Sequence, residues 1–300
     1  MTDSIMNGWA GTFGSLALVV VTALVTVTAA VRGIWSPCGL SMISTINPFS
    51  ERSRGNRYWL TATWFTAGSA LGGALLGALA AVGAALWGSL AASAAVTAGV
   101  GSVGCLIAAA SDSSTFGFRL PVHPRQVNEQ WLARYRRWVY ACGFGVQIGV
   151  GFATYIVTAA VYLTVLLGAL SGSPATAFAV GLVFGLVRGL GVLLSSKAMD
   201  PGALRVLHRR LDLLAPWSLR AAMVVEAVGA AVLGYAAAGP FGLALVAGVL
   251  LVGRSRTPQR HHESSAESSA ESSAESSAPA SRPQPQAPID RYSPVSTQRR

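Results

Sequence analysis

Residues 58–86 read YWLTATWFTAGSALGGALLGALAAVGAAL, and they open the longest stretch of the chain without a charged side chain. In total, 54 consecutive residues between Arg57 and Asp112 carry no charge. A second such run, of 50 residues, separates Arg137 from Arg188. At about 1.5 Å per helical residue, each run is about 80 Å long, enough to cross a bilayer core twice. The sequence therefore predicts membrane-spanning α-helices, because hydrocarbon offers backbone amides no other partner.

The apolar runs make up residues 1–253, which we expect to form one transmembrane helical domain. Only 11% of the residues in the chain are charged, whereas soluble domains carry roughly 25%. We expect an all-α polytopic membrane protein with about seven spans, at 13–31, 59–86, 90–110, 138–168 and 175–196, and in a shorter hairpin within 221–253. The last span follows Gly239-Pro240 and has about 13 residues before Arg254. That is short for a full crossing, so a partial span stays open.

Basic residues are confined to alternate connections between the expected spans. Of the 22 basic residues, 20 fall in four places: 52–57, 119–137, 197–220 and the segment from Arg254. The intervening connections contain none, as the positive-inside rule requires. This distribution predicts a multi-pass plasma-membrane protein with its N-terminus outside and its C-terminus in the cytoplasm. The net charge of +10 is not accompanied by a basic-aromatic recognition motif, so we expect the lipid bilayer, and no nucleic acid, as partner.

Residues 254–300 differ in composition from the rest of the chain. Glu-Ser-Ser-Ala repeats four times from Glu263 to Ala278, and Pro-rich sequence follows. Such a segment lacks the apolar side chains that it would need to fold by itself. We therefore expect a disordered cytoplasmic tail.

Two of the basic connections carry amphipathic segments, 128–138 and 200–216. In 200–216, Asp200 suits an N-cap, Pro201 suits the first turn, and leucines recur on one face. In 128–138, aromatic residues recur at helical spacing beside arginines. We expect both segments to lie as helices in the inner membrane interface.

A faint internal repeat relates the two halves of the membrane domain. Pro37-Cys38 aligns with Ala153-Thr154 at an offset of 116 residues, and each copy then enters a glycine-rich span. The glycines recur at small-xxx-small spacing, which lets helices pack closely. Each copy has three spans, so the second copy is expected to be inverted in the membrane, as in many transporters.

The residues that carry this repeat also resemble a known family. Residues 36–38 (SPC) after the first span, the glycine-rich second span and residues 143–149 (GFGVQIG) are similar to the cytochrome c biogenesis protein CcdA and the membrane domain of DsbD. The resemblance covers roughly residues 10–195. Members of that family carry reducing equivalents across the membrane on one cysteine per repeat. Cys38 matches the first of these cysteines, whereas Thr154 stands at the second, so the resemblance implies the architecture with a degenerate second cysteine site.

Arg188 and Glu226 are ionisable residues inside apolar spans, where a charge costs several kcal/mol unless it is paired or hydrated. Arg188 lies nine residues from Lys197 and Glu226 six residues from Arg220, so both are expected roughly 9–14 Å from the inner interface. This similar depth predicts an Arg188–Glu226 pair, either as a structural clip between spans five and six or as part of an ion or solute site. Cys38 is either a reactive thiol beside a helix break or a small buried residue.

Uncharged polar residues near the repeat elements complete the expected pathway: Asn47, Gln147, Thr154 and Thr158. With Cys38, Arg188 and Glu226 they predict movement of a small solute or ion across the membrane. Helix–helix hydrogen bonding explains each polar residue individually just as well. The alternatives are thiol-based transfer of reducing equivalents through Cys38 with a partner protein, and a non-catalytic scaffold whose tail recruits partners. The sequence has no enzyme motif, zinc spacing or dinucleotide fingerprint, so we predict no catalytic residue, metal or cofactor.

Overall fold

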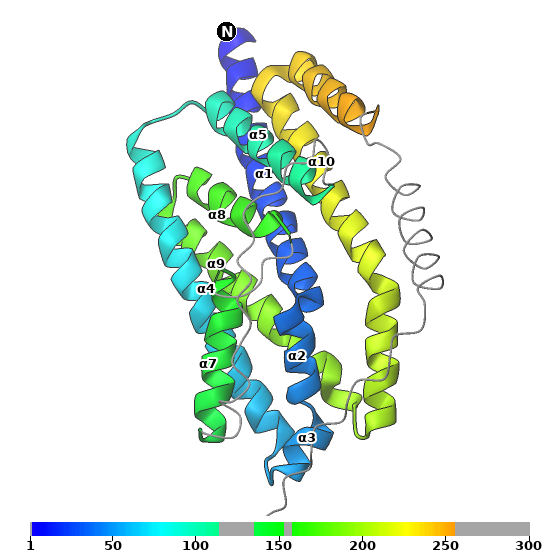
Figure 1. Ribbon diagram of the computed structural model, residues 1–300. Coiled ribbons are helices and arrows are strands. Elements are labelled where there is room, and N and C mark those ends of the chain that lie inside the picture. Colours follow the sequence, from blue (N-terminus) through cyan, green and yellow to red (C-terminus); the bar gives the residue numbers. More distant parts are fainter. Residues whose placement is uncertain (1, 114–134, 153–157, 256–300) are drawn as a thin grey trace, which may run out of the picture. The chain divides into compact units, whose positions relative to one another are not determined.

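The computed structural model describes residues 2–113, 135–152 and 158–255, and these are built from helices and their connections (Figure 1). The helices are α1 (Thr2–Arg32), α2 (Pro37–Thr45), α3 (Pro48–Ser53), α4 (Tyr58–Ser89), α5 (Ala94–Asp112), α7 (Arg137–Val150), α8 (Ala160–Leu170), α9 (Pro174–Leu190) and α10 (Pro201–Ser255), with 3-10 turns η1 (Gly33–Trp35) and η3 (Gly191–Lys197). Residues 256–300 of the predicted tail and most of the predicted interface helix 128–138 lie outside the described residues.

Within the described ranges, five helical segments are long and apolar enough to cross a membrane: Thr12–Trp35, Tyr58–Ser89, Ala94–Asp112, Pro174–Lys197 and Pro201–Val252. Their outward faces are apolar, as on α4, where Leu71, Leu75 and Leu79 are each more than half exposed. Leucines exposed at every fourth position suit lipid tails and would be costly in water. The predicted all-α fold is confirmed for the described residues, and its several long apolar helices are those expected of a membrane protein.

Helix α4 packs directly against α7 and α9 through small residues. A Cβ on Gly73 would lie 2.4 Å from the carbonyl oxygen of Gly181, and a Cβ on Gly77 would lie 2.5 Å from that of Phe178. Numbers rise along α4 as they fall along α9, so these two helices are antiparallel. We call this interface the glycine seam, and it comprises Gly68, Gly72, Gly73 and Gly77 of α4, Gly145 and Gly149 of α7, and Gly181 and Gly185 of α9.

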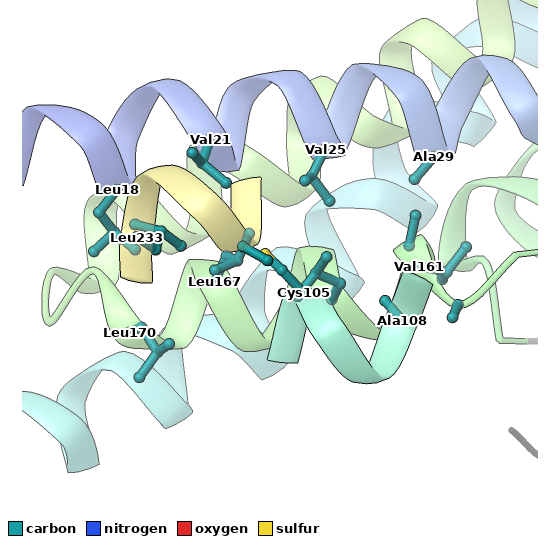
Figure 2. Close-up of a cluster of buried hydrophobic side chains, with 14 of the residues drawn as sticks. Leu18, Val21, Val25, Ala29, Cys105, Ala108, Val161, Leu167, Leu170 and Leu233 are labelled. Atoms are coloured by element: carbon teal, nitrogen blue, oxygen red, sulfur yellow. The ribbon is translucent and has the colours of Figure 1, made fainter. Parts of the chain in front are cut away.

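Larger apolar side chains form the core between α1, α5, α8 and α10 (Figure 2). Leu18, Val21 and Val25 follow one another on the buried face of α1. Leu167 of α8 and Leu233 of α10 belong to the same cluster, and both are fully buried. Helix α1 therefore joins elements from both halves of the chain.

The predicted fourth span, 138–168, is two short helices, so the prediction of one continuous span is wrong. Helix α7 ends at Val150, and the residue that caps it, Gly151, has a φ of +76°. Before the first turn of α8, Asp112 of α5 accepts hydrogen bonds from the Thr158 hydroxyl and, at 2.7 Å, from the Ala159 N–H. A carboxylate at this position satisfies donors that hydrocarbon would leave orphaned. The break therefore depends on a partner that is distant in sequence.

The predicted interface helix 200–216 is not separate from the sixth span but continuous with it in α10. The predicted start of the helix is confirmed, because Pro201 is its first residue and Asp200 Oδ1 accepts the Ala203 N–H at 2.8 Å. Pro216 lies inside the helix without ending it, although it removes one backbone donor.

The chain bends sharply within α10 at Ala238 and Gly239, where Gly239 has a φ of +62° (Figure 1). The segment after the bend packs back against the one before it, since a Cβ on Gly242 would lie 2.1 Å from the carbonyl oxygen of Gly234. The predicted break at Gly239-Pro240 is thus observed. The count of seven spans is not confirmed, because α7 and α8 are each short and five of the described helical segments are long and apolar enough to cross a membrane.

Candidate functional site

Cys38 lies in the first turn of α2, directly after the break that ends α1. Ser36 caps this helix: its hydroxyl accepts the Gly39 N–H at 3.0 Å and donates to the carbonyl oxygen of Gly33 at 2.7 Å. Pro37 occupies the first helical position, which its fixed φ favours. Cys38 itself is 1% exposed. Cys38 is therefore both buried and at a helix N-terminus, so its position fits a reactive thiol beside a helix break as well as a small buried residue.

Arg188 of α9 approaches the same break from the second half of the chain. Its guanidinium lies against Gly33, where a Cβ would stand 2.8 Å from the Arg188 Cζ. Cζ also lies 5.6 Å from the centre of the Phe184 ring, a cation–π contact. The Cys38 thiol is within electrostatic range of Arg188. Arg188 is 5% exposed, and the structure thus brings two of the predicted site residues together.

Glu226 of α10 is 1% exposed and faces a different set of helices. Neither of its carboxylate oxygens has a hydrogen-bond partner among the described residues. Its charged and titratable neighbours are Asp112 and Cys105 of α5. The predicted Arg188–Glu226 pair is not formed in the described structure, because Arg188 points to the α1–α2 break and Glu226 to α5. Similar depth in the membrane did not place the two side chains on facing surfaces.

Asp112 is a site residue that the sequence reasoning missed. Its carboxylate accepts hydrogen bonds from the hydroxyl of Thr158, a predicted pathway residue that is 3% exposed, and from the adjacent Ala159 N–H. Arg32, at the end of α1, interacts electrostatically with Asp112 and donates a hydrogen bond of 3.0 Å to the Ser218 hydroxyl of α10. Asp112 is the charge that ends the longest uncharged run, which was the available signal. Arg32, Asp112 and Glu226 bring ionisable groups from three spans to one interface.

Asn47 has a local structural role at the start of α3. Its Oδ1 accepts the Ser50 N–H at 2.9 Å, and its Nδ2 donates to the carbonyl oxygen of Ser44 at 2.7 Å. Gln147 is half-buried on α7. Thr154, the position matched to the second family cysteine, lies outside the described residues.

Close to Asn47, Glu51 forms a buried polar cluster that the sequence did not reveal. Its carboxylate accepts hydrogen bonds from the hydroxyls of Thr61, at 2.6 Å, and Tyr140, at 3.0 Å. Arg54 forms an ion pair with it at 2.9 Å. Glu51 is completely buried, but both of its carboxylate oxygens have hydrogen-bond partners, so this cluster ties α3, α4 and α7 together.

Among the cavities of the described structure, one of about 200 Å³ lies between α1 and α9, and two others adjoin the helix connections and the α1–α2 break. The first of these two, of about 230 Å³, lies where the α4–α5 and α8–α9 connections meet α1, lined by residues that include Leu18, Trp87 and Leu170. The other, of about 20 Å³, adjoins Arg188 and Gly33. In the described part of the chain, no group of three or more His, Cys, Asp or Glu side chains is arranged to hold a metal ion.

The chain is similar to methylamine utilization protein MauF from three bacteria. The identity is 29% over 130 residues for Paracoccus versutus, 28% over 154 residues for Paracoccus denitrificans and 29% over 135 residues for Methylorubrum extorquens. These alignments cover 43%, 51% and 43% of this chain and 47%, 55% and 46% of the respective relatives. The chain thus spans about half the length of the curated relatives that it matches. No protein-family profile and no solved structure matches the chain.

Proposed function

We propose that this membrane protein moves a small solute or ion across the bilayer. The observation that carries the proposal is that Arg188 and Glu226 are both buried within apolar spans, at separate interfaces. An ionisable side chain at membrane depth costs several kcal/mol unless it is paired or hydrated. Glu226 has no hydrogen-bond partner among the described residues that would offset this cost. Ionisable side chains buried at two different interfaces favour a role in handling a charged or polar cargo.

The arrangement of the helices supports the same proposal. The offset of 116 residues carries the start of α4 at Tyr58 onto the start of α9 at Pro174, and these helices run antiparallel. Each half also has a helix break, after α1 and after α7. We therefore propose two inverted three-helix repeats and a final span after Gly239, as in the CcdA and DsbD membrane fold. In such folds, broken helices line the cargo path near the midplane.

The likeness to MauF suggests one cargo to include in a first test. Those relatives are named for methylamine utilization, so methylammonium belongs in the panel of probes together with amino acids and short carboxylates. The purified full chain would be reconstituted into vesicles, and currents on a solid-supported membrane would be recorded after each probe is added. We expect at least one probe to give a current that protein-free vesicles lack.

The variant that tests the site is Arg188→Gln, with Arg205→Gln as its control. Arg205 is an exposed arginine of α10, so its loss leaves the interior unchanged. We expect Arg188→Gln to lower the current at least about tenfold, because the interior loses its buried cation. Full current from Arg188→Gln, or no current from the wild-type protein with any probe, would contradict the proposal.

A second candidate function is thiol-based transfer of reducing equivalents, and one observation favours it. Cys38 combines a helix N-terminus with a nearby guanidinium, the surroundings in which reactive cysteines are found. Because Thr154 has no sulfur, Cys38 would exchange electrons with a thiol of a partner protein. Membrane-permeant maleimide, added after oxidant or reductant, measures the reactivity of this thiol. Labelling that is independent of redox treatment, with unchanged transport in Cys38→Ser, would eliminate this candidate.

A further inference from the structure

Glu226 lies on the face of α10 that is turned into the bundle. Ala222, Ala230 and Leu233 share this face at helical spacing, and each is fully buried. The Ser102 hydroxyl of α5 donates to the Ala230 carbonyl oxygen at 2.8 Å, one turn beyond Glu226. The carboxylate is therefore enclosed by protein rather than turned to lipid.

The helices around α10 bring few titratable or charged groups to this place. Within the described side chains, α5 carries Cys105 and Asp112, α1 carries Arg32, and η3 carries Lys197. Cys105 lies near Gly229, where a Cβ would stand 3.3 Å from its Sγ (Figure 2 shows Cys105 in the surrounding apolar cluster).

On α10 itself, Arg220 does not reach back to Glu226 as a partner. Its guanidinium carbon stacks at 5.2 Å over the ring of Trp217. Both oxygens of Glu226 consequently remain without a hydrogen bond from the described residues.

The two acidic side chains of this interface differ in their hydrogen bonding. Asp112 accepts hydrogen bonds from the Thr158 hydroxyl and the Ala159 N–H, and Arg32 interacts with it electrostatically. Glu226 has no donors among the described residues, so burial of its ionised form costs more free energy than burial of its neutral form. A metal cation would need several oxygen ligands, whereas a proton needs only the carboxylate itself. The chemistry of the site thus suits a proton.

We propose that Glu226 is a proton-binding site inside the membrane and that its protonation is coupled to cargo movement. A proton taken from water on one side converts the carboxylate to a carboxylic acid, and its release to the other side restores the carboxylate. The ionised form of Glu226 places a negative charge near Asp112, which accepts the hydrogen bonds at the start of α8. Protonation of Glu226 would therefore change how firmly Asp112 holds α8. The coupling rests on the proposed transport function, whereas proton binding does not.

Infrared difference spectroscopy of the full chain in lipid tests proton binding directly. Titration between about pH 5 and about pH 9 should reveal the carbonyl stretch of a protonated carboxylic acid that disappears as the pH rises. Glu226→Gln should lack this band. Asp212→Asn, which alters an exposed carboxylate of the same helix, should retain it. Identical titrations of wild type and Glu226→Gln would overturn the proposal.

A further variant covers the case in which Glu226→Gln does not fold. Glu226→Asp keeps a titrating carboxyl group but moves it by one methylene, so its band should shift in frequency or midpoint. An unshifted band in Glu226→Asp would assign the signal to another residue and overturn the proposal.

Uptake of the cargo into vesicles under an imposed pH gradient tests the coupling. Wild-type uptake should follow the direction of the gradient, and uptake by Glu226→Gln should be insensitive to it. Gradient-independent uptake by the wild type would overturn the coupling but leave the transport function standing. If the wild type transports nothing, the proposed function fails, and the infrared band then decides the proton site independently.

Discussion

The glycine seam and the α1–α5–α10 interface are both buried and both join helices from the two halves of the chain, but they are built differently. In the seam, backbone meets backbone, and the nearby buried acid Glu51 has hydroxyl and guanidinium partners throughout. At the α1–α5–α10 interface, side chains separate the helices, and the buried acid Glu226 has no hydrogen-bond partner among the described residues.

This difference indicates that the glycine seam stabilises the fold, whereas the α1–α5–α10 interface contains a group that destabilises it. Close backbone contact between small residues maximises van der Waals packing in a membrane, where no hydrophobic force joins helices. An unpartnered carboxylate does the opposite, since it destabilises the fold that contains it. Buried polar groups that lack hydrogen-bond partners are typical of functional sites. We infer that the seam is the rigid frame and that the α1–α5–α10 interface responds to charge.

The largest effect is expected at the seam. In Gly73→Ala the added Cβ would lie 2.4 Å from the carbonyl oxygen of Gly181 and 2.6 Å from the Gly185 Cα, and backbone on both sides cannot yield. We expect a loss of about 3 kcal/mol or more, or no folded protein. The matched control is Gly248→Ala, because nothing lies within 4 Å of its Cβ position. Thermal unfolding in detergent would measure both, and equal melting temperatures would refute the seam as the frame.

The next effect compares the two buried acids by replacing each with leucine. Glu51→Leu removes the acceptor of the Thr61 and Tyr140 hydroxyls, so we expect it to destabilise the fold by about 3 kcal/mol. Glu226→Leu removes a carboxylate that has no such donors, so we expect a gain of about 1 kcal/mol. Melting temperatures at neutral pH would check the opposite signs. A similar loss in both variants would mean that Glu226 is structural.

A smaller effect is expected at the start of α8. Asp112→Ala leaves the Thr158 hydroxyl and the Ala159 N–H without their acceptor, which should cost about 2 kcal/mol. Asp200→Ala removes an exposed cap of α10 and should cost about 1 kcal/mol or less. Hydrogen exchange at α8 amides would locate the change. Unaltered protection of α8 in Asp112→Ala would argue against Asp112 as its anchor.

The smallest effect compares one interhelical hydrogen bond from each region. Ser69 donates to the Gly185 carbonyl oxygen at 2.7 Å in the seam, and Ser102 donates to the Ala230 carbonyl oxygen at 2.8 Å beside α10. Replacing either serine with alanine should cost about 0.6 kcal/mol, the average for such bonds in membranes. Equilibrium unfolding in mixed micelles would measure both. A much larger loss from Ser102→Ala would show that the α1–α5–α10 interface is as tightly specified as the seam.

The amino-acid sequence predicted the spans well wherever an uncharged run had clear ends. The expected spans 59–86, 90–110 and 175–196 correspond to α4, α5 and α9 with η3 to within a few residues. The candidate site was predicted less well. Cys38 and Arg188 do lie close together, but the expected Arg188–Glu226 pair does not form, because depth in the membrane says nothing about the direction in which a helix turns a side chain.

The long uncharged runs were enough to predict an α-helical membrane protein, because such runs have no other way to satisfy their backbone in hydrocarbon. Three further features depend on contacts between distant segments: the break in span four, the hydrogen bonds that Asp112 accepts from the start of α8, and the presence of partners for Glu51 but not for Glu226 among the described residues. Each of these depends on which helix faces which. Side-chain packing between segments far apart in the chain sets which helices face each other, and local hydropathy does not predict it.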